Sequence, residues 1–225
     1  MHPAPTCALF DLDNTLTDRA ASIRQFSWHF FEDFRSHLHE AVTFDEVHKV
    51  MQVGDGGGYR PKETMFQEIQ TNLQWDKVPA IETITDYWYR VSARSMQLRP
   101  DVHQTLGALQ QRGLSLGMIT NGKTNVQNAT IDATNLREYF SVIIISEACG
   151  FRKPDPQIFH LALSALQTSP EQAVYIGDHP QSDIEGARNA GLYTVWFAGV
   201  HAWSEALLPP KYQITQLSQL LDVLG

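Results

Sequence analysis

Two aspartates, Asp11 and Asp13, stand two positions apart directly after the apolar run 7–10. A short apolar run of this kind is typical of a buried strand. At the end of such a strand one carboxylate of the pair can act as a nucleophile, while the other lies beside it to transfer protons. Burying the two acids is costly unless a cation pairs with them. Because Asp and Asn are also favoured in turns that end strands, the pair alone fits a turn as well as a reactive site.

Other polar groups follow the apolar runs 114–119, 142–145 and 173–176. In chain order they are Thr120, Asn121, Lys153, Asp178 and Asp183. Ligands of open parallel sheets bind at the carboxyl ends of the strands, so we expect these groups to meet Asp11 and Asp13 on one rim. Such a rim carries four carboxylates, a lysine, a hydroxyl and an amide.

Each of these groups also has an ordinary explanation when it is taken alone. The segment 120–122 has the composition of a turn, a lysine before a proline is usually solvated, and Asp183 fits the cap of a following helix. Asp155 is expected to be only a helix cap, with Pro156 in the first turn. His179 is expected to be structural or to face solvent. His201 and Trp203 follow the last strand and could border the site, although packing is the expected role of both.

The elements that must position these groups alternate between strands and helices from Leu98 onward. Five strands are expected, at 7–10, 114–119, 142–145, 173–176 and 193–197. A helical pattern precedes each of the last four strands, at 102–111, 125–134, 156–167 and 183–190. Gly113 and Gly191 stand where helix ends favour glycine. Alternation of this kind predicts parallel strands joined by right-handed crossovers.

The segment from Thr17 to Met96 is helical in pattern throughout and separates the first strand from the others. Apolar residues at spacings of three and four mark its first helix: Ile23, Phe26, Phe30, Phe34 and Leu38. A capping box at 43–46 opens the second helix, and a glycine-rich loop at 54–58 ends it. The predicted fold class is therefore α/β: a doubly wound, Rossmann-like parallel sheet formed by 1–16 and 97–225, with 17–96 inserted as an all-helical lid.

Composition limits the possible partners. The chain has 225 residues, 43% of them hydrophobic, which is enough for one domain with an insertion. A formal net charge of -8 and the lack of any basic run argue against a nucleic-acid polymer as partner. No apolar stretch is long enough to span a bilayer, no signal-peptide pattern is found, and Cys7 and Cys149 form no metal-like pair. We expect a cytoplasmic protein without a membrane partner.

The four motifs together resemble the haloacid dehalogenase superfamily, in its phosphatase-like branch. The resemblance covers nearly the whole chain and follows the family's order: Asp-x-Asp-x-Thr at 11–15, Thr-Asn at 120–121, Lys-Pro at 153–154, and the acids Asp178 and Asp183. The helical segment after the first strand resembles that family's cap.

This resemblance implies a Mg²⁺-dependent phosphatase that forms an aspartyl-phosphate. Asp11 would attack phosphorus, and Asp13 would act as general acid and then as general base. Lys153 would neutralise negative charge, while Thr120 and Asn121 would hold the phosphoryl oxygens.

The same resemblance implies a Mg²⁺ ion held by the Asp11 side chain, the Asp13 backbone carbonyl and Asp178, with Asp183 in support. Mg²⁺ is suited to this place because it takes oxygen ligands and shares them with a substrate phosphate.

The substrate is expected to be a small phosphorylated metabolite, such as a nucleotide, a sugar phosphate or phosphoglycolate. In the loop 54–62, Arg60 or Lys62 would pair with a second anionic group and Tyr59 would stack on a ring; an ordinary exposed loop is the competing interpretation. An acid at Asp13 favours phosphate esters over carbon–halogen bonds, because a halide needs no proton. A phosphomutase or phosphotransferase on the same scaffold is the alternative, followed by a non-catalytic protein that binds a phosphorylated ligand.

Overall fold

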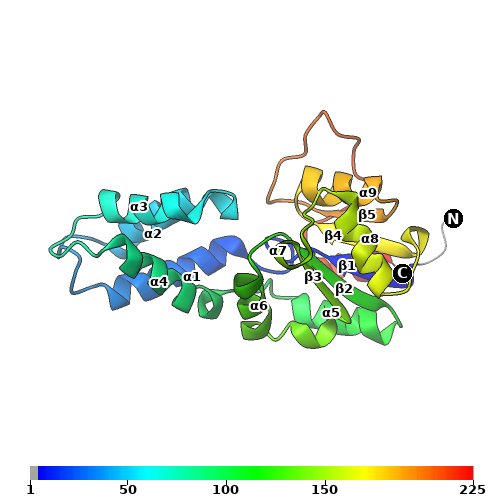
Figure 1. Ribbon diagram of the computed structural model, residues 1–225, viewed down its shortest axis with the longest axis horizontal. Helices are drawn as coiled ribbons and strands as arrows, with labels where there is room; N and C mark the ends of the chain where they lie inside the picture. Colours follow the sequence, from blue (N-terminus) through cyan, green and yellow to red (C-terminus); the bar gives the residue numbers. More distant parts are fainter. Residues whose placement is uncertain (1–4, 225) are drawn as a thin grey trace. The chain divides into compact units, whose positions relative to one another are not determined.

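The computed structural model describes residues 5–224 and forms two compact units (Figure 1). The first unit runs to Leu16 and resumes at Leu98, and the second unit is Thr17–Gln97. Residues 1–4 and 225, which the predicted first domain includes, lie outside the described residues. That the two units act as a catalytic core and a cap stays a prediction.

The first unit is built on a six-stranded sheet in the order β3-β2-β1-β4-β5-β6, and all five pairings are parallel. The strands are β1 (Cys7–Phe10), β2 (Ser115–Thr120), β3 (Val142–Ile145), β4 (Ala173–Gly177), β5 (Tyr193–Phe197) and β6 (Tyr212–Ile214). The predicted α/β class with a parallel sheet is confirmed. The sixth strand was not predicted, because three residues are too few to show a period. The strand order reverses beside β1, which is where such sheets bind ligands.

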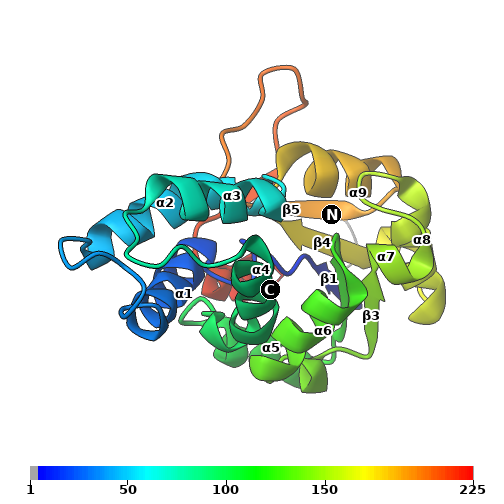
Figure 2. The same ribbon diagram turned by 60° about the vertical axis from the view of Figure 1, so that its left-hand side comes forward.

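Helices cover both faces of this sheet (Figures 1 and 2). One face carries α5 (Val102–Gln111), α6 (Thr124–Ala133) and α10 (Leu220–Val223), and the other carries α8 (Pro156–Ala165) and α9 (Gly186–Asn189). Alternate residues of β1 enter the two cores, as the pleat requires: Ala8 and Phe10 pack on the first face, Cys7 and Leu9 on the second. The whole of β1 is therefore buried, and its end is held firmly in place.

Several helix ends follow the predicted chemistry. Asp155 caps α8 by accepting a hydrogen bond from the Gln157 backbone N–H, with Pro156 in the first turn. Gly113 and Gly191 both have positive φ, at 85° and 87°, which glycine adopts without strain. These local signals therefore mark where the crossover helices begin and end.

The predicted helix over 183–190 is wrong in detail. A π-helical turn, η5 (Pro180–Glu185), comes first, and α9 has only four residues. His179 caps this turn: its Nδ1 accepts from the backbone N–H groups of Gln181 and Ser182, while the Asp183 carboxylate accepts from the His179 N–H. The turn thereby brings the Asp183 carboxylate back towards the end of β4.

The second unit consists of α1 (Arg19–Asp33), α2 (Phe44–Asp55), α3 (Lys62–Asn72) and α4 (Ile81–Val91), with a short turn η1 (Gly56–Gly58) after α2. The residues of the predicted apolar stripe are buried, but α1 ends at Asp33, before Phe34 and Leu38. Their rings pack closely, with the ring centroids of Phe30 and Phe34 4.3 Å apart. The capping box of Thr43 and Glu46 opens α2 as predicted. No helix within residues 5–224 is long and apolar enough to cross a membrane.

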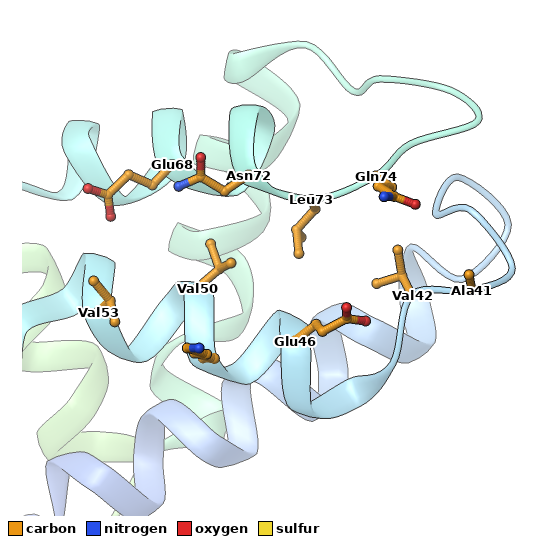
Figure 3. A pocket seen from close by; sticks show the side chains of 10 residues that line it. Ala41, Val42, Glu46, Val50, Val53, Glu68, Asn72, Leu73 and Gln74 are labelled. Carbon is orange, nitrogen blue, oxygen red and sulfur yellow. The ribbon is translucent and has the colours of Figure 1, made fainter.

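A groove of about 510 Å³ opens between α2 and α3 of the second unit (Figure 3). Val50, Val53 and Glu46 line it from α2, while Glu68 and Asn72 line it from α3. None of its lining residues belongs to a motif with predicted chemistry.

Candidate active site

Three buried carboxylates meet at the ends of the neighbouring strands β1 and β4. Phe10 pairs with Ile176, and the Asp11 N–H donates to the Ile176 carbonyl at 2.9 Å, so Asp11 and Asp178 follow adjacent strand ends. One oxygen from each of Asp11, Asp178 and Asp183 lies within 4.8 Å of the others. The predicted acids of three separate motif positions therefore form one cluster.

Lys153 is the cation in this cluster. Its buried Nζ donates to Asp11 Oδ1 at 2.6 Å, to Asp183 Oδ1 at 2.7 Å and to the Tyr175 hydroxyl at 2.9 Å. An ammonium group has three N–H donors, so all of them are engaged. The Asn121 side chain clamps the Lys153 backbone, accepting from its N–H and donating to its carbonyl at 3.0 Å each. Lys153 is thus fixed at both its backbone and its side chain.

Thr15 ties two of the aspartates together. Its hydroxyl lies 3.0 Å from Asp11 Oδ2 and 3.2 Å from Asp178 Oδ1, and its single hydrogen is shared between them. Arg99 holds the turn from outside by donating to the carbonyls of Asn14 and Thr15. Thr15 therefore orients the Asp11 loop through its hydroxyl.

Asp13 lies outside the three-aspartate cluster and is held by α6. The Gln127 amide donates to Asp13 Oδ2 at 2.9 Å and to the Thr120 hydroxyl at 2.6 Å. Gln127 is buried and shares the core-facing side of α6 with Ile131. A polar residue on the apolar face of a helix is the sequence signal by which Gln127 could have been found.

The electrostatics of the cluster are unbalanced. Burial raises the pKa of Asp11, and although Lys153 lowers it, Asp183 and Asp178 raise it further, so it lies well above its usual range. Burial also raises the pKa of Asp178. For Lys153 burial favours the neutral amine, but Asp11 and Asp183 outweigh that effect and its pKa rises. Three carboxylates thus face one ammonium group, and the excess charge is negative.

The donor set suits a hard divalent cation. All three groups are carboxylates, the oxygen ligands that such ions prefer. Asp178 Oδ2 is buried and accepts no hydrogen bond from any described residue, with His201 Nε2 3.2 Å away as an ion-pair contact. Gly177 allows the carboxylates to come this close, since a Cβ there would lie 2.5 Å from the Asp183 side chain. The residues present therefore fit a bound cation.

Two more side chains, Tyr175 and His201, contact the carboxylate cluster. Tyr175 lies in the buried strand β4, and its hydroxyl is within hydrogen-bond distance of Lys153, Asp183 Oδ1 and the Ile119 carbonyl. A buried tyrosine needs a partner for its hydroxyl, which is the signal that the sequence offered. Of the two interpretations of His201, bordering the site fits the structure better than packing, since Nε2 lies 3.2 Å from Asp178 Oδ2.

The two residues of the helical unit that were predicted to contact a substrate, Arg60 and Lys62, form ion pairs with acidic residues of the same unit. Arg60 pairs with Glu68 at 2.6 Å and donates to the Val53 carbonyl, while Lys62 pairs with Asp55 at 2.5 Å. Contact of Arg60 or Lys62 with a substrate stays a prediction.

Comparison with known proteins places these motifs in a family. The model of the haloacid dehalogenase-like hydrolases matches residues 8–197, which ends before the segment that carries His201. Glyceraldehyde 3-phosphate phosphatase of Pyrococcus furiosus is 31% identical over 225 residues, covering 96% of this chain and 91% of that protein.

Two further similar proteins differ in how much of each chain the match covers. Phosphoserine phosphatase of Thermus thermophilus is 40% identical over 103 residues, but the match covers 46% of this chain and only 41% of that protein. The crystal structure of the HAD-hydrolase YfnB from Bacillus subtilis, bound to magnesium, superposes with a TM-score of 0.78 at 23% identity. It covers 99% of this chain and 100% of that one, and at this identity it supports the fold.

Proposed function

The chain belongs to the haloacid dehalogenase-like hydrolases, in their phosphatase-like branch, and we propose that it hydrolyses a small phosphomonoester through a phosphoryl group carried on Asp11. One observation carries this proposal: Asp11 lies 2.6 Å from Lys153 inside a cluster of three buried carboxylates. A nucleophilic carboxylate needs such a fixed place at a strand end, and buried acids with shifted pKa values are typical of active sites.

In the first step an Asp11 oxygen forms a bond to phosphorus while the bond from phosphorus to the ester oxygen breaks. The leaving oxygen takes a proton from Asp13. In the second step Asp13 takes a proton from water, the water oxygen attacks phosphorus, and the bond to Asp11 breaks with release of inorganic phosphate. Gln127 supports this role by holding Asp13 Oδ2 in one orientation.

The remaining core motif residues balance charge during the transfer. Lys153 lies against Asp11 and would offset the negative charge of the phosphoryl group. Thr120 and Asn121 follow β2 and would hold phosphoryl oxygens, which matters because phosphoryl transfer depends mainly on positioning and electrostatics. The clamp from Asn121 to the Lys153 backbone adds to this by fixing the lysine.

The cation that best fits the cluster is Mg²⁺. Asp11 and Asp178 would hold it together with the Asp13 backbone carbonyl, and Asp183 would support them. When bound, the ion supplies the positive charge that lets four carboxylates and a phosphate share one site.

The proposed substrate is a small phosphorylated metabolite: a nucleotide, a sugar phosphate or phosphoglycolate. Two relatives support this class by name, since glyceraldehyde 3-phosphate and phosphoserine are both small phosphomonoesters. Arg60 and Lys62 are proposed to pair with a second anionic group of that substrate. We further propose that the enzyme acts in the cytoplasm and has no nucleic-acid polymer as partner.

The test is release of inorganic phosphate from a panel of phosphorylated metabolites with Mg²⁺ present. Asp11→Asn, which keeps the side-chain shape but is a poor nucleophile, should lower kcat by about 10⁴-fold or more while the protein stays folded by circular dichroism. A chelator should stop the wild-type reaction, and added Mg²⁺ should restore it. Normal turnover in Asp11→Asn would refute the nucleophile, and activity that survives chelation would refute the metal. Transfer of phosphate to a second metabolite would instead indicate a mutase or phosphotransferase.

A further inference from the structure

The segment that joins β5 to β6 contributes a side chain to the carboxylate cluster. In Figures 1 and 2 it is the long orange connection after β5. His201, in this segment, places Nε2 3.2 Å from Asp178 Oδ2. The Asp178 side chain is 1% exposed and that of His201 is 26% exposed, so the histidine reaches the buried acid from the surface.

Aromatic packing holds the beginning of the segment at the same aspartate. The Trp196 indole N–H donates to the Asp178 carbonyl at 2.8 Å. Trp203 packs edge-on against Trp196, with ring centroids 5.0 Å apart. Trp203, which follows His201, is thereby held against a tryptophan of β5 that is itself bonded to Asp178.

The far end of the segment is attached to α9. Arg188 donates to the carbonyls of Leu208 and Pro209 and pairs with Glu185 at 3.0 Å. His179 also lies beside His201, with ring centroids 4.9 Å apart, and its own ring is held by two backbone N–H groups. His201 thus stands in a fixed frame, although it is partly exposed.

We propose that His201 is a positioning residue for Asp178 in the cation site. Thr15 contacts one oxygen of Asp178 and His201 contacts the other, so together they fix the rotation of this carboxylate. A metal-binding carboxylate keeps its direction through such outer partners, and loss of one partner typically weakens metal affinity 10- to 100-fold. This inference rests on the proposed function, because it requires the cluster to bind a divalent cation.

The test is isothermal titration of Mg²⁺ into the chelator-treated, full-length protein at fixed pH. His201→Ala should weaken the dissociation constant for Mg²⁺ about 10-fold or more. His201→Gln should stay within a few-fold of wild type, because its side-chain amide can place an N–H group beside Asp178 Oδ2, where Nε2 lies 3.2 Å away in wild type. His160→Ala, which removes an exposed histidine from α8, is the matched control and should match wild type. Thermal unfolding in chelator verifies that each variant is folded.

The outcomes separate this inference from the proposed function. If wild type binds Mg²⁺ and His201→Ala binds it equally well, His201 has no positioning role. If His201→Ala binds it more tightly, the imidazole competes with the ion, which also overturns the proposal. If wild type binds no divalent cation, the proposed metal site itself is wrong and the inference fails with it.

Discussion

Among residues 5–224, a cluster of buried charged side chains lies in each of the two units, and the two clusters differ in the sign of their excess charge. In the sheet unit three aspartates surround Lys153. In the helical unit one aspartate, Asp55, is 2% exposed and pairs with both Arg19 and Lys62. Both cations also lie over the Trp88 ring, at 5.7 and 5.4 Å from its centroid.

The pKa directions follow from this difference. Burial raises the pKa of Asp55, but Arg19 and Lys62 outweigh it, and the pKa ends below its usual range. For Asp11 burial is the largest effect as well, and Lys153 alone does not offset it. A buried acid that is paired with enough cations stabilises its unit. Buried acids that outnumber their cations keep raised pKa values and attract further positive charge. The comparison favours the sheet cluster over the helical one as the place for the proposed cation.

The largest expected difference is in the free energy of unfolding when the lysine of each cluster, Lys153 or Lys62, is replaced by methionine. In chelator, Lys153→Met should lower the free energy of unfolding by about 3–5 kcal/mol, because it leaves buried carboxylates without a cation. Lys62→Met should lower it by only about 1 kcal/mol, since Asp55 keeps Arg19. Denaturant unfolding at neutral pH measures both.

Mg²⁺ provides the control for this pair. Added Mg²⁺ should restore part of the stability lost in Lys153→Met and none of that lost in Lys62→Met. Equal losses in the two variants, or equal responses to Mg²⁺, would show that the clusters do not differ as proposed.

The next contrast uses the same substitution, Asp to Asn, in both clusters, and we expect it to change the free energy of unfolding in opposite directions. Asp55→Asn should cost about 2–3 kcal/mol, because two cations lose their buried partner. Asp178→Asn should raise stability in chelator by about 1 kcal/mol, because it removes one of three mutually repelling acids. The midpoints of thermal unfolding should therefore move in opposite directions, and movement in the same direction would break the comparison.

The pH dependence of Asp55 sharpens that test. Its folded-state pKa is lowered, so its contribution is fully present above the unfolded value of about 3.9 and is lost as the pH falls through the folded value. The difference in stability between wild type and Asp55→Asn should shrink as the pH falls below about 4. A difference that stays constant down to pH 3 would mean that the carboxylate charge is not its source.

Much of the sheet was predictable because its strands are continuous apolar runs between polar turns. The strands at 7–10 and 142–145 were predicted with the observed bounds. Asp11, Lys153, Asp178 and Asp183 could be grouped beforehand because each follows a strand and parallel strands end on one rim. Their roles remain predictions that the experiments above address.

The contacts that were missed depend on side chains from separate segments meeting in space. Tyr175 looks like one more apolar residue of β4 until its hydroxyl is found beside Lys153. Gln127 and His201 lie far along the chain from Asp13 and Asp178, and no local period links them. The π-helical turn at η5 was missed for a related reason, since a histidine side chain, which is not a usual cap, begins it.

The smallest contrast compares two buried tyrosines that each contact a carboxylate. Tyr175→Phe should lower kcat about 5-fold with little change in KM, because Lys153 loses one of three partners and a hydrogen bond contributes about 1 kcal/mol. Tyr87→Phe removes a hydroxyl that donates to Asp33 at 2.7 Å in the helical unit; it should cost about 1 kcal/mol of stability and leave kcat unchanged. Steady-state kinetics and thermal unfolding of both variants measure this. An equal fall in kcat would mean that loosening either unit slows the enzyme, and Tyr175 would then have no special relation to Lys153.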